Sequence, residues 1–206
     1  MEFNNELGSK SAPRIEKAAR KIADDSVEGY EDVLISTLDF LFQKKTKSWK
    51  AQAEIIRAIG ITGTEKVVPY LKELALKDFS SLVLYRYLGF SICLLEDIKS
   101  GNLSYLNSIL KSSNQLLISG ACSALLFSEF IPENKDIKNI LKYVVNNCED
   151  EGILITPRCY IAAACYSWPS GLTKAFLLTC AKSNFSILNE ISKASLTGIK
   201  TKQVLI

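Results

Sequence analysis

The side chains that most often carry acid–base and nucleophilic chemistry are scarce in this sequence. It contains no histidine, which removes the commonest general base and any Ser–His or Cys–His nucleophile pair. Its ten glycines form neither the GxxxxGK nor the GxGxxG pattern of a phosphate-binding loop. These absences predict a protein that is not an enzyme and that uses no cofactor.

Adjacent acidic residues are the remaining candidates for paired-carboxylate chemistry. They occur at Asp24-Asp25, Glu31-Asp32, Glu96-Asp97 and Glu149 to Glu151. Neighbours on a helix point about 100° apart, so their carboxylates converge poorly on one substrate. We interpret most of them as solvated helix ends and loops. The cluster from Glu149 to Glu151 is an alternative calcium site, but it lacks the EF-hand spacing, and the sequence predicts no metal site.

The six cysteines are Cys93, Cys122, Cys148, Cys159, Cys165 and Cys180. Five of them lie in apolar runs such as FSICLL, GACSALL and IAAACY, where a free cysteine behaves as a small hydrophobic residue. No CxxC pair is present, and no histidine is available to complete a mixed zinc site. We therefore expect reduced cysteines in the core.

Composition indicates one globular domain. The chain has 206 residues, of which 48% are hydrophobic and 23% charged, with a net charge of +3. Its first ten residues lack the charged and apolar regions of a secretory signal. The longest apolar stretch, 116–127, is shorter than the roughly 20 residues that span a bilayer. We expect a cytoplasmic protein without a membrane anchor.

Apolar residues recur at helical spacing, and no segment shows the period of two that marks a strand. The clearest pattern lies in 48–78, where two short amphipathic helices meet at a small loop. Pro13, Asn114 and Thr156 mark further helix starts, and 96–101 is expected to form a loop. Neither helix of 48–78 can bury its apolar face alone, so the sequence predicts an all-α protein of stacked helix pairs.

A repeat of 35 residues is the strongest signal in the chain. At this offset three columns of the second helices align: Leu71, Leu106, Leu141 and Phe176; Leu74, Ile109, Val144 and Thr179; Ala75, Leu110, Val145 and Cys180. Eleven of these twelve residues are apolar. Repeats of two helices at this period are typical of solenoids.

The helix pair in 48–78 resembles the HEAT repeat in its short bacterial form. The matching residues are Ala51, Arg57-Ala58-Ile59-Gly60, Gly63, Val67-Val68-Pro69, Leu71 and Leu74. Over 79–184 the resemblance reduces to a hydrophobic pattern. Tetratricopeptide repeats have nearly the same period, but their Trp, Gly-Tyr and terminal Pro positions are not met in this chain.

The resemblance implies a right-handed α-solenoid of about five helical hairpins, of the HEAT-like or ARM type, with a C-terminal capping helix. We expect a polar, frayed N-terminal segment at 1–10, one domain at 11–198 and a tail at 199–206. The sequence leaves two alternatives for the tail: it docks through Val204 to Ile206, or it is free. The last helix, from Ile187, is expected to cover the apolar residues Ala175 to Leu178.

In proteins of this family the second helix of each repeat lines the concave side. The resemblance therefore implies that second-helix residues outside the buried columns form a partner-binding surface. These residues are Lys72, Glu73, Tyr105, Asn107, Asn139, Lys142, Tyr143 and Asn146.

These features favour a non-catalytic solenoid that binds another protein on its concave surface. An immunity protein that blocks a bacterial toxin or effector is one version, and an adaptor or chaperone is another. Tyr and Asn, which are adaptable contact residues, suit such an interface.

Two alternatives belong to other functional classes. Some HEAT-like proteins are DNA glycosylases with a basic groove, which Lys72, Lys142 and Lys174 would imitate together with Tyr70, Tyr105 and Tyr143. The low net charge and only five arginines weigh against nucleic acid. The bilin lyases, which contain HEAT-like repeats, represent the enzyme alternative by fold analogy alone.

Overall fold

The computed structural model describes residues 2–44, 48–112, 114–148 and 156–201. These residues form helices and loops and contain no strand, so the all-α prediction is confirmed. The α-helices are α1 (Asn4–Leu7), α2 (Ala12–Asp24), α3 (Glu31–Gln43), α4 (Trp49–Thr62), α5 (Val68–Ala75), α6 (Val83–Ile92), α7 (Ser104–Ile109), α8 (Gln115–Phe127), α9 (Asn134–Asn147), α10 (Pro157–Ala164), α11 (Ser170–Cys180) and α12 (Ser186–Leu196). A 3₁₀ turn, η1 (Glu65–Val67), precedes α5, and a π-helical turn, η2 (Cys93–Ile98), continues α6.

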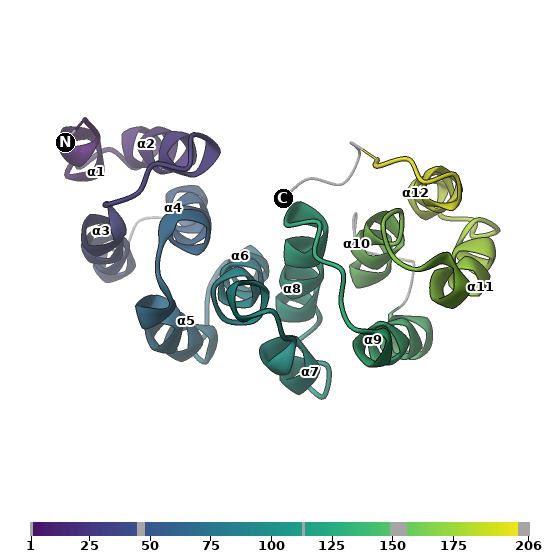
Figure 1. Ribbon diagram of the computed structural model, residues 1–206. Helices are drawn as coiled ribbons and strands as arrows, with labels where there is room; N and C mark the ends of the chain where they lie inside the picture. The colour runs from purple at the N-terminus through teal and green to yellow at the C-terminus, as the bar shows by residue number, and fades with distance from the viewer. Residues whose placement is uncertain (1, 45–47, 113, 149–155, 202–206) are drawn as a thin grey trace.

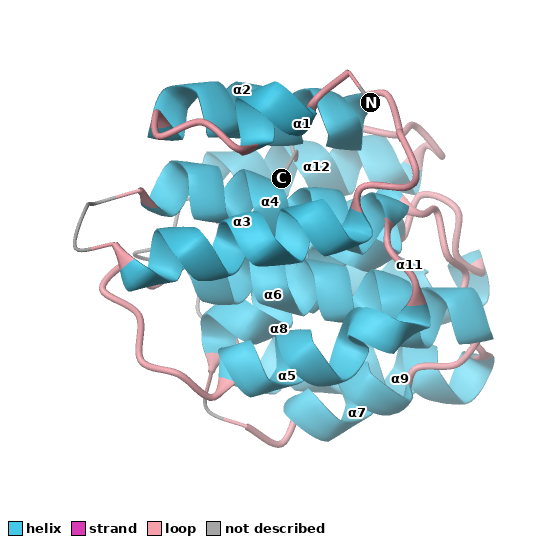
Figure 2. Ribbon diagram, turned by 90° about the vertical axis from the view of Figure 1, so that its left-hand side faces the viewer, coloured by secondary structure: helices cyan, strands magenta, loops and turns pink. Residues whose placement is uncertain are grey.

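From α2 onward the chain alternates between two curved layers of helices (Figures 1 and 2). The inner layer, on the concave side, holds α2, α4, α6, α8, α10 and α12, which pack side by side in that order. The outer layer, on the convex side, holds α3, α5, α7, α9 and α11. Each helix of the outer layer follows a helix of the inner layer in the chain.

The second helices therefore lie on the convex side, and the prediction that they line the concave side is wrong. Close packing within the inner layer gives a physical reason. A Cβ atom on Gly120 would lie 1.8 Å from the carbonyl oxygen of Arg86, and one on Gly89 would lie 2.0 Å from that of Leu117. Glycine thus lets α6 and α8 approach more closely than any side chain would allow. Because the helices of this layer are more closely spaced than those of the other layer, it lies on the concave side.

The repeat columns predict burial well for two of the three sets. Leu71, Leu106, Leu141 and Phe176 are all buried, as are Leu74, Ile109 and Val144 of the second set. Thr179, the polar member of the second set, is exposed. The third column fails at Val145, whose exposed fraction is 51%. Three leucines and Phe176, at the same position of α5, α7, α9 and α11, therefore attach the outer layer to the inner layer.

Both ends of the described chain are packed. The N-terminal segment is not frayed, because α1 buries Leu7 and the ring of Phe3 lies edge-on to Tyr30 at 5.7 Å. At the other end α12 packs on α10 and α11, and Phe176 and Leu177 are buried as expected.

Ala175 and Leu178, in contrast, remain exposed, so the covering of this apolar segment is incomplete. The predicted docking of Val204 to Ile206 lies outside the described residues. Within the described part of the chain, no helix is both long and apolar enough to cross a membrane.

Candidate functional site

Two neighbouring grooves run between helices of the outer layer. The α7–α9 groove has a volume of about 750 Å³. Its lining residues are Ser104, Asn107, Ser108, Leu110, Lys111, Lys135, Asp136, Asn139, Lys142, Tyr143, Asn146 and Asn147. The α5–α7 groove, of about 500 Å³, is lined by Glu65, Val68, Pro69, Lys72, Glu96, Ser100, Asn102 and Ser104. Ser104 borders both, so the two grooves adjoin at the start of α7.

The α7–α9 groove brings together five of the eight residues that the sequence predicted as a binding surface. They are Asn107, Asn139, Lys142, Tyr143 and Asn146. Lys72 lines the α5–α7 groove instead, and Glu73 is an exposed residue that pairs with Lys77 at 3.6 Å. Tyr105 is buried, with an exposed fraction of 6%, so its prediction as a displayed contact residue is wrong.

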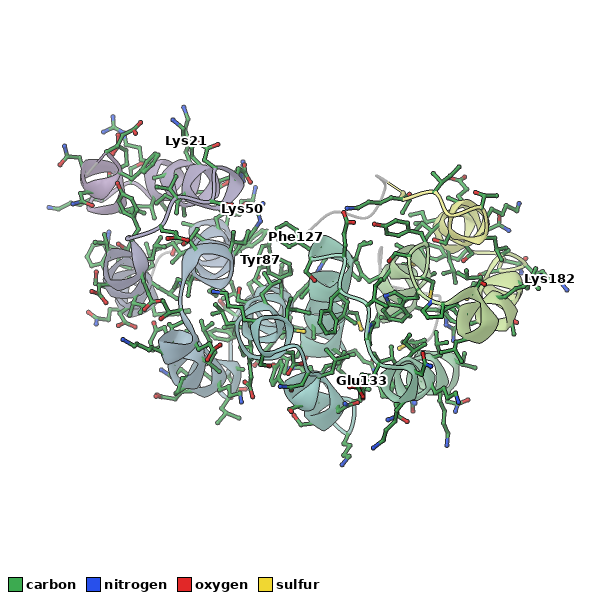
Figure 3. All side chains as sticks on the ribbon, viewed as in Figure 1. Lys21, Lys50, Tyr87, Phe127, Glu133 and Lys182 are labelled. Atoms are coloured by element: carbon green, nitrogen blue, oxygen red, sulfur yellow. The ribbon has the colours of Figure 1, made fainter. Side chains whose placement is uncertain are left out.

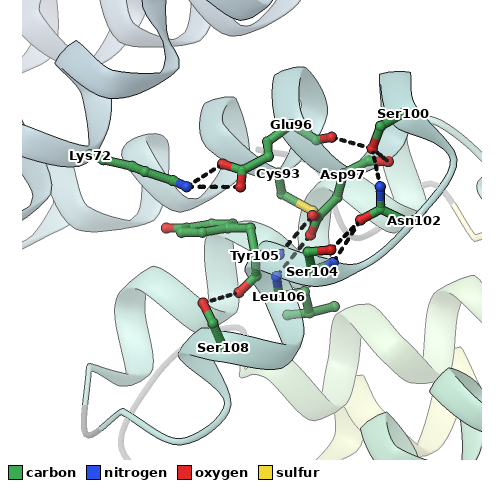
Figure 4. A network of polar contacts seen from close by, with 10 residues as sticks. All are labelled: Lys72, Cys93, Glu96, Asp97, Ser100, Asn102, Ser104, Tyr105, Leu106 and Ser108. Carbon is green, nitrogen blue, oxygen red and sulfur yellow. Dashed lines mark hydrogen bonds and ion pairs between the residues drawn. The ribbon is translucent and has the colours of Figure 1, made fainter.

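Tyr105 is buried because α7 is anchored at its N-terminus by a carboxylate from the preceding π-helical turn (Figure 4). The Oδ1 and Oδ2 atoms of Asp97 accept hydrogen bonds of 2.8 Å from the backbone N–H groups of Tyr105 and Leu106. These groups belong to the first turn of α7, where no carbonyl of the helix can satisfy them. The side chain of Tyr105 is drawn into the core together with its backbone.

Asp97 itself was misjudged from sequence, because it lies in a helical turn rather than in a solvated loop. It is fully buried, and burial raises the pKa of its carboxyl group to about 6 against the opposing effect of the two N–H donors. Its neighbour Glu96 points outward and pairs with Lys72 at 2.6 Å (Figure 4). Adjacent acids on one helix thus have different roles, one anchoring α7 and the other lining the α5–α7 groove.

Helix α9 is positioned by its apolar face and displays the opposite face to the groove. Ile137, Ile140 and Val144 are buried, whereas Asn139 and Lys142 are exposed. This alternation follows the helical period, so the polar face of α9 was predictable from the sequence.

Side-chain hydrogen bonds fix the groove's floor and its width. Asn107 on α7 donates a hydrogen bond of 2.9 Å to Oδ1 of Asp136 on α9. Gln115 on α8 donates one of 3.0 Å to the hydroxyl oxygen of Tyr143. Tyr143 is half-buried, and burial raises the pKa of its hydroxyl group, which therefore stays neutral. These contacts hold the two walls at a defined separation before any partner binds.

The groove carries an excess of positive charge that the sequence analysis missed. Lys142 was among the predicted binding residues, whereas Lys111 and Lys135 were not; all three line the groove, and within the described residues none of them lies within ion-pair distance of an acid. Among the lining residues that the structure describes, Asp136 is the one acid, and Asn107 already binds it. Lys135 and Lys142 follow the same helical face as Asn139, a signal present in the sequence. Lys111 lies beyond the end of α7, where periodicity gives no guidance.

The cysteines do not form a reactive site among these residues. All six are free and buried, in agreement with the sequence prediction of core residues. Burial raises the pKa of the Cys93, Cys122 and Cys165 thiols, so little of the nucleophilic thiolate is present near neutral pH.

Metal-binding clusters are likewise not evident in the part of the chain that the structure covers, where no three His, Cys, Asp or Glu residues converge. The alternative calcium cluster from Glu149 to Glu151 lies outside the described residues.

Comparison with known proteins does not assign a family. No protein-family model, no curated protein and no solved structure matches this chain.

Proposed function

We propose that this protein is a non-catalytic, HEAT-like α-solenoid of right-handed curvature that binds a partner protein. The 35-residue repeat, the two helical layers and the buried leucine column support the solenoid assignment. The protein would act in the cytoplasm. It would serve either as an inhibitor of a bacterial toxin or effector or as an adaptor.

The observation that carries the proposal is the composition of the α7–α9 groove. Four asparagines and a tyrosine gather with three lysines between two helices held at a defined separation. Amides offer both donors and acceptors, which match the backbone and polar side chains of another chain. Because the walls are already in place, a partner binds without a large ordering cost.

The buried thiols and the lack of histidine support a binding role over a catalytic one. No Ser–His or Cys–His pair exists in the sequence. The Cys93, Cys122 and Cys165 thiols are buried and hold their protons. The lyase alternative therefore has no nucleophile among them.

Nucleic acid is the second candidate, and the unpaired groove lysines favour it. Fewer aromatic side chains are available to stack on bases than the sequence predicted. Tyr105 is buried, and the Tyr70 hydroxyl donates a hydrogen bond of 2.7 Å to Asp39. Lys174 lies on α11, outside the groove. Of the proposed stacking residues only Tyr143 lines the groove, whereas single strands bind through successive aromatic platforms.

The test is affinity capture of the partner with the wild-type chain and with three variants. Asn139→Trp fills the groove without changing charge. Thr179→Trp places the same side chain on α11, away from the groove, and Lys50→Trp places it on the concave side (Figure 3). We expect the partner to be lost from Asn139→Trp alone, with binding weakened by about tenfold or more.

Two outcomes would contradict the proposal. Capture that is unaffected by Asn139→Trp would remove the groove from the interface. Loss with Lys50→Trp in place of Asn139→Trp would move the interface to the concave side, where Figure 3 shows Lys50, Tyr87 and Phe127. Circular dichroism of each variant establishes that the fold is retained.

A further inference from the structure

The charges of the two adjoining grooves differ in sign and in how far they are neutralised. Among the described lining residues of the α7–α9 groove, three lysines face one aspartate. In the α5–α7 groove Lys72 is neutralised by Glu96 at 2.6 Å, and Glu65 adds a second acid to the lining. The outer surface is therefore basic on one side of α7 and acidic on the other.

The three groove lysines are arranged around the polar centre of the α7–α9 groove. Lys135 lies in the first turn of α9 and Lys142 two turns further along, on the same helical face. Lys111 follows α7 on the opposite wall. All three side chains are exposed, so their ammonium groups are available to a ligand.

Lysine ammonium groups without an ion-pair partner can form favourable ion pairs with the carboxylates of another molecule. An ammonium group donates hydrogen bonds and accepts none, so its best partner in a protein chain is the carboxylate of Asp or Glu. The neighbouring amides of Asn139 and Asn146 donate and accept, which suits the backbone between such acids. The lining contains no arginine, the residue that binds phosphate in bidentate geometry.

We propose that the α7–α9 groove recognises an Asp/Glu-rich, extended segment of the partner protein. The acidic residues lie against Lys111, Lys135 and Lys142, and the backbone lies against the asparagines. This inference rests on the proposed function, and it adds the chemical class of the bound segment. The α5–α7 groove rejects a continuation of the same acidic run, because Glu65 and Glu96 line it. The acidic run of the segment is consequently confined to the α9 side of α7.

The probes are three fluorescently labelled peptides of equal length and a single-stranded oligothymidylate. One peptide alternates Glu with Ser, the second carries Gln in place of Glu, and the third carries Lys. Each is titrated against the full chain by fluorescence anisotropy at low and at high ionic strength. We expect the Glu peptide to bind about tenfold more tightly than the Gln peptide at low salt, and this preference to shrink at high salt.

Two triple variants with the same change of net charge assign the binding to the groove. The groove variant carries Lys111→Gln, Lys135→Gln and Lys142→Gln. The control carries Lys138→Gln, Lys174→Gln and Lys182→Gln, three exposed lysines of the outer layer that do not line the groove. We expect the groove variant to lose about tenfold in affinity for the Glu peptide, and the control to lose less than about twofold.

Each remaining outcome overturns the inference in a different way. Equal affinity for the Glu and Gln peptides, or equal losses in the two triple variants, would show that acidic residues are not read by this groove. Tighter binding of the oligothymidylate, with the same dependence on the groove lysines, would identify nucleic acid as the ligand. A captured partner that is lost with Asn139→Trp but retained by the groove lysine variant would keep the proposed function and refute the acidic segment.

Discussion

The helices of the inner and outer layers differ in how closely they pack. In the inner layer, glycines bring α6 and α8 into backbone contact, as the close approach of Gly89 and Gly120 shows. In the outer layer, a groove lies between α7 and α9, and the hydrogen bond from Asn107 to Asp136 links the two helices. The inner layer provides the continuous core, and the outer layer retains open space.

The same contrast holds for charge. Between α2 and α4, Arg20 binds Glu54 at 3.1 Å, and Arg57 binds Asp24 at 2.8 Å, so the ionic groups there neutralise one another. In the α7–α9 groove the described lysines have no such partners. Paired charges mainly support the fold, whereas unpaired charges beside a groove are available to another molecule. This difference is why we place the binding site on the outer layer.

The largest effect is expected where the inner layer is tightest. A Cβ on Gly120 would meet backbone atoms of Arg86 and Phe90, which cannot move aside as a flexible side chain would. We expect Gly120→Val to destabilise the protein by more than about 4 kcal/mol. Urea unfolding followed by circular dichroism measures it.

Gly171 in α11 provides the matched control, because no atom lies within 4 Å of its added Cβ. Gly171→Ala should be neutral or stabilise by up to about 1 kcal/mol. Similar losses at both glycines would contradict the assignment of tight packing to the inner layer alone.

The attachment of the outer layer to the inner layer is tested at the leucine column. Leu106 is fully buried in the contact of α7 with the core. We expect Leu106→Ala to cost about 2–5 kcal/mol, through lost burial and the cavity left behind. Asn139→Ala, on the exposed face of α9, should change stability by less than about 0.5 kcal/mol. If the two cost the same in thermal and urea unfolding, the outer layer is not held by this column.

The burial of the Asp97 carboxyl group predicts a dependence of stability on pH. Because its pKa is 3.8 in the reference state and about 6 in the folded protein, the folded protein binds this proton more tightly. The free energy of unfolding attributable to Asp97 is therefore highest below 3.8 and falls as pH rises through about 6. We expect the free energy of unfolding of Asp97→Asn to depend less on pH in this range.

We measure the urea midpoints of the wild type and of Asp97→Asn across this pH range. Their difference gives the contribution of Asp97 to stability, because the contributions of the other carboxyl groups cancel. Asp25→Asn, at an exposed carboxyl, serves as the control. An unchanged slope in Asp97→Asn would refute the raised pKa of the buried carboxylate.

A smaller stability effect is expected from the hydrogen bond between Gln115 and Tyr143 in the groove. Tyr143→Phe removes the hydroxyl that accepts from Gln115 and leaves the ring in place. We expect a loss of about 0.5–1.5 kcal/mol in thermal unfolding, because one partly buried hydrogen bond is broken. Tyr143→Ala should cost more, since the half-buried ring is lost as well. Loss of partner binding with Tyr143→Phe at unchanged stability would instead make the hydroxyl a direct contact.

Much of the helical organisation was predictable from the sequence, because it follows from local patterns. Pro13 and Pro157 mark helix starts, and α2 and α10 begin within one residue of them. The 35-residue offset located the buried leucines of the second helices. The π-helical turn was not predictable, since η2 lies where Asp97 reaches forward to α7, a contact that no local pattern encodes.

Some residues of the candidate site were likewise predictable from local sequence patterns, and others were not. Asn139, Lys142 and Asn146 share the polar face of α9, and helical periodicity was enough to place them together. Tyr105 was misplaced because its position near the start of a six-residue helix is set by Asp97 rather than by amphipathic spacing. Lys111 was missed because it follows the helix and reaches the groove only through the turn after α7.

Sequence was sufficient for properties that depend on neighbours along the chain: an all-helical fold, the first buried column of its repeat and the polar face of α9. Which layer faces the inside of the curve depends on how closely separate helices approach. That approach is determined by Gly89 and Gly120 meeting the backbone of the opposing helix. The groove and its unpaired lysines likewise arise between helices distant in sequence, so only the tertiary structure could bring them together.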